Sequence, residues 1–285
     1  MDPSSTQWRH VHARDRPPGR ANPSRPDERH PRVMDLSVGS LVLLSLSGFV
    51  AGAINAAAGG GSLITFPALI AAGYPPLIAN VTNNVAVSPG YVTGAWGYRG
   101  DLRGQGRRIV PLVVVSAIGS IVGVGMILVS SQDAFDSVVP FLVLAACALL
   151  AAQPAIGRRL GERTGAHERP GIGSLVAQTL AAAYGGYFGA ALGVAVLALL
   201  GVFFDDTLQR LNALKALLQL VIGATAALGF ALLTPVAWGA VAIVGPASLA
   251  GGVLGARLAQ RVSDRVLRGG IVTYGVAAAV WLFLR

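Results

Sequence analysis

The stretch LQRLNALKALLQLVIGATAALGFALL, residues 208–233, decides how this chain must fold. It is long and apolar enough to cross a bilayer as one helix, because about 20 apolar residues span the hydrocarbon core. Lys215, the only lysine of the protein, lies within this stretch. An ammonium group at that depth needs an anion, a polar partner or a route to the membrane surface. Lys215 is therefore the first candidate functional residue.

The rest of the composition is that of a helical membrane protein with several spans. Of the 285 residues, 53% are hydrophobic, only 12% are charged, and 37 are glycines. Apart from Lys215, almost no ionisable group interrupts the long segments 36–58, 109–130, 136–156, 171–199, 211–256 and 271–284. We therefore predict an all-α polytopic membrane protein that is embedded in a lipid bilayer.

The composition also argues against several classes of function. The single cysteine, Cys147, rules out a disulfide framework, and all four histidines lie in the tail or in a connecting loop. We therefore expect no metal and no other cofactor. No histidine within the spans could activate a serine, so an enzyme is not expected. The net charge of +9 comes mostly from arginines beside apolar spans, which is typical of cytoplasmic loops and argues against nucleic-acid binding.

The first 33 residues differ from the remainder of the chain. They are rich in Pro, Arg, Asp and Ser and contain few large apolar side chains. We expect a disordered tail, and the segment lacks the apolar core of a signal peptide. We hypothesise that translation starts at Met34. The predicted organisation is a tail over 1–33, a first membrane repeat over 34–157, a cytoplasmic linker over 158–170 and a second membrane repeat over 171–285.

The two repeats become visible when the chain is aligned with itself at an offset of 132 residues. Matched in order and without gaps are Gly61 with Gly193, Asn80 with Asn212, Asn83 with Lys215, Thr93 with Thr225, Gly97 with Gly229, Ser116 with Ser248, Gly119 with Gly251 and Gly123 with Gly255. Each half thus predicts a helix, a glycine break, a short helix and three further helices. The predicted ranges are 36–57, 62–72, 76–98, 108–130 and 136–156, followed by 171–190, 193–204, 208–231, 236–258 and 266–284.

The arginines indicate how the two halves are oriented. Four arginines within 99–108 follow the asparagine-rich helix of the first half, whereas the equivalent turn of the second half, 232–235, is uncharged. At the next turn the bias is reversed, since 130–136 is acidic and its counterpart over 257–268 carries four arginines. Cytoplasmic placement of every cluster requires inverted repeats of five membrane elements, with both termini outside. The alternative is eight spans in parallel repeats with cytoplasmic termini.

Two glycine-rich motifs predict interruptions of the helices within the membrane. They are Gly59-Gly60-Gly61-Ser62 and the segment 185–193, which ends at Gly193. Consecutive glycines can interrupt a helix and leave amides without partners. A helix that restarts at Ser62 or Val194 directs its positive N-terminal end at the break, which suits an anion. The glycine pairs at 119 and 123 and at 251 and 255 are instead interpreted as helix-packing faces.

A second polar constellation lies on the helix predicted over 76–98. Amides and hydroxyls can donate hydrogen bonds to an oxyanion, and a lysine can supply the charge. We predict that Lys215 faces a central cavity lined by Asn80, Asn83, Asn84 and Asn212, with Thr82 beside them and with Asn55, Ser88, Thr93, Gln219 and Thr225 as possible further lining. Two alternatives stay open: Lys215 extends its stem to the membrane surface, or the asparagines simply join helices through hydrogen bonds.

These motifs resemble those of the sulfite exporter TauE/SafE family of bacterial membrane proteins. The resemblance extends from about Leu36 to Leu284, and its pieces are Gly48-Phe-Val-Ala-Gly52, Gly59-Gly-Gly-Ser-Leu with Phe66-Pro67, Ala79-Asn-Val-Thr-Asn-Asn, Gly186-Tyr-Phe-Gly-Ala with Leu192-Gly193, and Gly255-Ala-Arg-Leu. Each motif is short, but their order and duplication are fairly specific. Ala190-Ala191-Leu192 stands where a richer glycine run is common, which argues against a fully symmetric double break.

The resemblance implies a secondary transporter in the bacterial inner (plasma) membrane. Its expected substrate is a small anion such as sulfite, an organosulfonate or a related organic acid, exported by alternating access. The residues expected to bind it are Lys215, Asn80, Thr82, Asn83, Asn84, Asn212, Gly59, Gly60, Gly61, Ser62 and Gly193. The alternative functions are a non-transporting membrane scaffold and an anion channel.

Overall fold

The computed structural model describes residues 37–57, 59–160, 170–255 and 264–284. Within it, Leu36–Arg285 forms one compact unit. The predicted tail, Met34 and residues 161–169 of the predicted linker lie outside the described part of the chain.

The described residues form ten α-helices and one π-helical segment. They are α1 (Val38–Ala57), α2 (Ser62–Ala71), α3 (Pro76–Gly97), α4 (Gly106–Val129), α5 (Gln132–Leu160), α6 (Ile172–Tyr187), α7 (Leu192–Phe203), α8 (Leu208–Leu233), α9 (Trp238–Ala250), η1 (Gly251–Gly255) and α11 (Asp264–Phe283). The predicted helices are confirmed, with ends that differ by at most four residues. One predicted helix, 236–258, consists of α9 and its π-helical continuation η1.

Four of these helices are long and apolar enough to cross a membrane. They are the spans Val38–Asn55, Gly106–Val129, Gln132–Ala155 and Leu208–Leu233. Shorter apolar helices accompany them, among them α2 with 10 residues and α7 with 12 residues, too short to cross a bilayer alone. α3 has 22 residues, but its asparagines make it more polar than the four spans. The protein is therefore an all-helical, multi-pass membrane protein.

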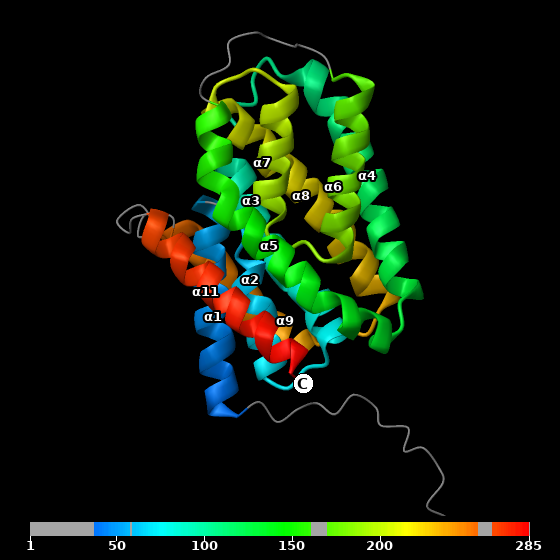
Figure 1. The fold of residues 1–285 in the computed structure, drawn as a ribbon, viewed down its shortest axis with the longest axis vertical. Coiled ribbons are helices and arrows are strands. Elements are labelled where there is room, and N and C mark those ends of the chain that lie inside the picture. Colours follow the sequence, from blue (N-terminus) through cyan, green and yellow to red (C-terminus); the bar gives the residue numbers. More distant parts are fainter. Residues whose placement is uncertain (1–36, 58, 161–169, 256–263, 285) are drawn as a thin grey trace, which may run out of the picture. The chain divides into compact units, whose positions relative to one another are not determined.

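The helices are packed around a central pair, α3 and α8. α1 packs on α9 and η1, and α6 packs on α4, which Figure 1 shows beside α6. α3 also contacts α9, α8 contacts α4, and α5 packs on α11. The contact of α1 with α9 thus has a counterpart in that of α6 with α4, and the contact of α3 with α9 has one in that of α8 with α4.

Glycines allow the backbones of these packed pairs to touch. A Cβ atom added to Gly123 of α4 would lie 2.1 Å from the carbonyl oxygen of Ala183 in α6. A Cβ atom added to Gly251 of η1 would lie 1.9 Å from the carbonyl oxygen of Phe49 in α1. Gly119 likewise packs against the backbone of α6. The predicted packing role of these three glycines is confirmed, whereas the side-chain surroundings of position 255 are not described.

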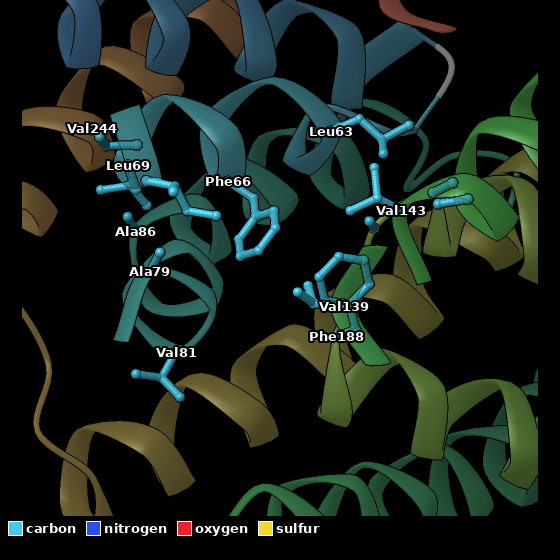
Figure 2. Packing of buried hydrophobic residues seen from close by; sticks show 14 of the residues in the cluster. Leu63, Phe66, Leu69, Ala79, Val81, Ala86, Val139, Val143, Phe188 and Val244 are labelled. Atoms are coloured by element: carbon cyan, nitrogen blue, oxygen red, sulfur yellow. The ribbon is translucent and has the colours of Figure 1, made fainter. Parts of the chain in front are cut away.

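A cluster of buried apolar side chains connects the two halves. Phe66 of α2 meets Phe188, which follows α6, edge to face with ring centroids 5.2 Å apart. Figure 2 shows both rings next to Val139 and Val143, which α5 contributes. Because each aromatic side chain buries a large apolar area, this contact holds α2 against the end of α6.

We predict opposite effects of alanine at two glycines of α4. Gly123→Ala should lower the free energy of unfolding by about 1–3 kcal/mol, because its new methyl group overlaps the α6 backbone. Gly125→Ala should be neutral or stabilising by up to about 1 kcal/mol, because no atom lies within 4 Å of the added Cβ. Thermal unfolding of the purified protein in detergent measures both. Equal stability of the two variants would contradict the packing role of Gly123.

Candidate functional site

The first predicted break is present between α1 and α2. Gly59 and Gly60 have φ angles of 73° and 139°, a backbone that side-chain-bearing residues rarely adopt. The Asn55 Oδ1 atom accepts hydrogen bonds from the N–H groups of Gly60 at 3.1 Å and Gly61 at 2.8 Å. The sequence predicted that these amides lack partners within the protein and could bind a ligand. In the structure they are instead hydrogen-bonded to Asn55.

The second break is also present, although alanines replace glycines there. Gly189 has φ 75° and Ala191 has φ 55°, so an alanine adopts the left-handed conformation just before α7. The N–H of Gly189 bonds to the carbonyl of Tyr184 at 3.1 Å, as the N–H of Gly59 bonds to that of Ile54 at 3.0 Å. Both breaks therefore exist, but they are not fully symmetric, as the alanines led us to expect.

The two breaks are alike at one position and differ at others. Gly59 and Gly189 share a positive φ and a bond to the carbonyl five residues earlier. Gly60 also has a positive φ, whereas the other positive φ of the second break is that of Ala191. Gly193 lies within the first turn of α7, and its pairing with Gly61 stays a prediction.

The asparagines of α3 bond to the second break and to α2. The Nδ2 atom of Asn80 donates to the carbonyl of Tyr187 at 2.8 Å, and that of Asn84 donates to the carbonyl of Phe188 at 3.5 Å. The Thr65 hydroxyl donates to Asn83 Oδ1. These three asparagines are buried. Their amides therefore stabilise the broken backbone and the contact between α2 and α3.

The other two polar residues predicted near the cavity lie elsewhere. Thr82 is buried, and its hydroxyl oxygen accepts a hydrogen bond from the N–H of Ala237, just before α9, at 3.1 Å. Asn212 is half-buried, and its side chain donates to the carbonyl of Leu208 on its own helix at 2.9 Å.

Lys215 lines a pocket between α3 and α8. Its neighbours in the pocket wall are Asn55, Gly90, Tyr91, Gly94, Tyr98, Ala216 and Gln219. Lys215 is 3% exposed and Gln219 4% exposed, so neither side chain faces lipid. Within the described part of the chain, the Lys215 ammonium has no hydrogen-bond or ion-pair partner. The Nδ2 donor of Asn55 is also buried without a partner.

The two breaks meet beside this pocket. A Cβ atom added to Gly59 would lie 3.0 Å from Cα of Gly193, and one added to Gly193 would lie 2.8 Å from the Gln219 side chain. Of the predicted site residues, Lys215 is part of the described pocket wall, and Gly193 lies behind its Gln219 side chain with Gly59 next to it. Ser62, Asn80, Asn83, Asn84 and Asn212 are not part of that wall.

Asn55 is the site residue that sequence reasoning ranked too low. It appeared there only as possible further lining, yet it both closes the first break and presents a donor in the pocket wall. Its position five residues before Gly60, at the end of an apolar helix, was the available signal. A break within the membrane needs hydrogen-bond partners for its backbone, and a polar side chain about one helical turn before the break can supply them.

The pocket is narrow in this conformation. Its volume is about 10 Å³, which accommodates roughly one water molecule. An anion with several heavy atoms needs more room. Binding of such a ligand therefore requires a wider pocket than this conformation offers.

A cluster of charges lies at the pocket end of α8. Asp206 accepts a hydrogen bond from Arg108 Nη1 at 2.7 Å and lies 3.0 Å from Arg210 Nε. Gln105 donates to the Arg210 carbonyl at 3.2 Å. This Arg108–Asp206–Arg210 cluster ties the loop before α4 to the start of α8. Burial raises the pKa of Asp206, but hydrogen bonds from the Thr207 N–H, Arg210 and Arg108 outweigh it and hold the pKa below its ordinary value of 3.8.

We predict that Asp206→Asn lowers the free energy of unfolding by about 3 kcal/mol near neutral pH, because Arg108 loses its anion. The folded-state pKa of Asp206 is depressed, so its contribution is present above the unfolded value and disappears as the pH falls through the lower folded value. The stability difference between wild type and variant should therefore be constant above about pH 5 and shrink in acid. The free energy of unfolding of wild type and variant, measured from neutral pH into acid, checks both the size of the loss and its pH dependence.

Asp205→Asn is the matched control for this prediction. Asp205 is adjacent, also half-buried, and has no ion pair among the described residues. Its substitution should change stability by less than about 0.5 kcal/mol. A pH-independent difference for Asp206→Asn would contradict the electrostatic explanation.

The fold and the pocket together define a class of protein. Broken helices that meet within the membrane beside a buried charge are typical of multi-pass membrane transporters. The chain belongs to the sulfite exporter TauE/SafE family, which matches residues 44–282. The members that it resembles are membrane transporters rather than enzymes.

Individual relatives carry transporter names. The chain is 28% identical over 259 residues to "Probable membrane transporter protein ORF9" from Sinorhizobium sp., covering 88% of this chain and 95% of the relative. It is 29% identical over 238 residues to "Probable membrane transporter protein YfcA" from Escherichia coli K12, covering 81% and 82%. The "Probable membrane transporter protein" from Haemophilus influenzae is 36% identical over 114 residues, which are 39% of this chain and 44% of the relative. No solved structure gives a significant match.

Proposed function

We propose that this protein is a secondary transporter of the bacterial inner membrane that exports a small anion by alternating access. The substrate class is sulfite, an organosulfonate or a related organic acid, as the family description suggests. The observation that carries the proposal is Lys215, an ammonium buried in a pocket without any anionic partner among the described residues. An anionic substrate would supply that partner.

The other groups in the pocket wall suit an anion as well. The free Nδ2 donor of Asn55, the amide of Gln219 and the hydroxyl of Tyr91 can each donate a hydrogen bond to an oxyanion. The N-terminus of α2 begins at Ser62 beside the first break, and its dipole favours negative charge. No carboxylate lines the pocket, so a cationic substrate would meet only repulsion from Lys215.

The predicted site residues contribute in two ways in this proposal. Lys215, Ser62 and the glycines of the meeting breaks surround the anion directly. Asn80, Asn83 and Asn84 keep the second break and α2 in place while α3 moves against α8. Their hydrogen bonds to Tyr187, Thr65 and Phe188 support that positioning role.

We also infer that the two halves are inverted repeats. The exchanged contacts of α1 with α9 and of α6 with α4 support this inference. So do the equivalent backbone bonds at Gly59 and Gly189. Inverted repeats provide two conformations of similar energy, in which the halves exchange roles and the pocket opens to opposite sides. The short helices α2 and α7 then serve as the half-crossing elements of a ten-element arrangement.

The first test is flux through proteoliposomes that contain the full chain and labelled sulfite or ethanesulfonate. Wild type should show saturable transport of at least one of these anions. Lys215→Gln should reduce the apparent affinity by roughly tenfold to a hundredfold, because a charge-assisted hydrogen bond contributes about 1.5–3 kcal/mol. Unsaturable flux would indicate a channel, and no flux of either anion would favour a scaffold. Wild-type affinity in Lys215→Gln would remove Lys215 from the site.

Asn55→Asp separates the binding role of Asn55 from its structural role. The carboxylate keeps an acceptor for the N–H groups of Gly60 and Gly61, so the variant should remain folded. Its negative charge should weaken anion binding at least about tenfold, through repulsion and through pairing with Lys215. Asn55→Leu should instead lower stability, because it removes the acceptor of both bonds. Unchanged transport by Asn55→Asp would place the anion elsewhere.

A further inference from the structure

Lys215 is isolated from every other charge that the structure describes around it. The titratable groups in the pocket wall are the hydroxyls of Tyr91 and Tyr98. Of the remaining elements packed on α8, α7 has no titratable residue, and α6 has Tyr184, whose hydroxyl donates to the carbonyl of Ala190, and Tyr187. The charged residues of α4 are Arg107 and Arg108, and Arg108 and Arg210 are paired with Asp206 at the end of α8. Among the described residues, no carboxylate therefore neutralises Lys215.

This isolation makes the charge state of Lys215 depend on the ligand. A buried ammonium without an anion is costly, and a pocket with room for roughly one water molecule cannot hydrate it. The cost disappears when an anion binds beside it. An empty, closed pocket therefore favours the neutral amine, whereas an anion in the pocket favours the ammonium. Anion binding and proton binding at Nζ therefore favour each other.

We propose that Lys215 carries a proton across the membrane together with each anion. This inference rests on the proposed function. The anion enters from one side as the amine takes up one proton from the same aqueous phase. After the pocket opens to the other side, the anion leaves and the ammonium returns its proton to that phase. The empty carrier then reorients with a neutral lysine.

The charge balance follows from this one-to-one stoichiometry. A monoanion such as ethanesulfonate crosses with one proton and moves no net charge. A dianion such as fully ionised sulfite crosses with one proton and moves one negative charge, which a membrane potential negative inside drives outward. An empty carrier that kept its ammonium could not reorient at low cost and would only exchange one anion for another.

Lys215→Arg is the discriminating variant, because arginine keeps a positive charge at all relevant pH values. In proteoliposomes, wild type should accumulate external ethanesulfonate about tenfold per unit of an acid-outside pH gradient. Lys215→Arg should lose this accumulation yet still exchange external labelled anion for internal unlabelled anion, within about tenfold of the wild-type rate. Gly125→Ala should behave as wild type in both assays. If ethanesulfonate is not transported, labelled sulfite replaces it. Sulfite itself binds protons, but it does so equally in the assays of wild type and Lys215→Arg. The difference between the two proteins therefore still reports on Lys215.

A second measurement needs only the wild-type protein and therefore does not depend on the folding of a variant. The pH gradient and the membrane potential at which net ethanesulfonate flux stops are determined together. If one proton crosses with each ethanesulfonate, the pH gradient alone should set the condition of zero net flux, because no net charge moves. With sulfite as the probe, the pH gradient and the membrane potential should both shift that condition. Flux of ethanesulfonate that follows the potential alone, or accumulation by Lys215→Arg equal to wild type, would overturn proton coupling while leaving anion transport intact. Absence of both net flux and exchange for both anions in wild type would overturn the proposed function itself.

Discussion

The rest of the structure depends on how the two broken backbones find hydrogen-bond partners away from water. Each unpaired N–H or C=O group inside a membrane costs several kcal/mol, so a broken helix persists only where the protein supplies partners. At the first break the partner is the acceptor of Asn55, which binds two glycine amides. At the second break the partners are the donors of Asn80 and Asn84, which bind two carbonyls. The breaks share one backbone hydrogen bond, at Gly59 and at Gly189, but the chemistry that closes them is opposite.

This difference gives the two halves different functional capacities. In the first half, Asn83 is bonded to Thr65 and buried in the contact between α2 and α3. At the predicted offset of 132 residues its counterpart is Lys215, which has no partner in the described structure and lines the pocket. The aligned positions thus carry a hydrogen-bonded amide in one half and a buried ammonium in the other.

Most of the fold was predictable because membrane helices reveal themselves locally. Apolar length and glycine runs predicted the ten described helices and both breaks, with boundaries in error by at most four residues. The site was less predictable. The structure puts Asn55 and Gln219, expected only as further lining, and Tyr91 around Lys215, in place of the asparagines of α3. The link from Arg108 to Asp206 spans 98 residues and had no sequence signal.

The sequence by itself determined that the chain crosses a membrane, where its helices are interrupted and that one lysine lies among apolar residues. These properties follow from composition and spacing, which act over a few helical turns. Only the tertiary structure decided which polar groups close the breaks and which ones meet Lys215. An asparagine can donate to a carbonyl, accept from an amide or face a ligand with equal ease, so its role is chosen by the helix packed against it.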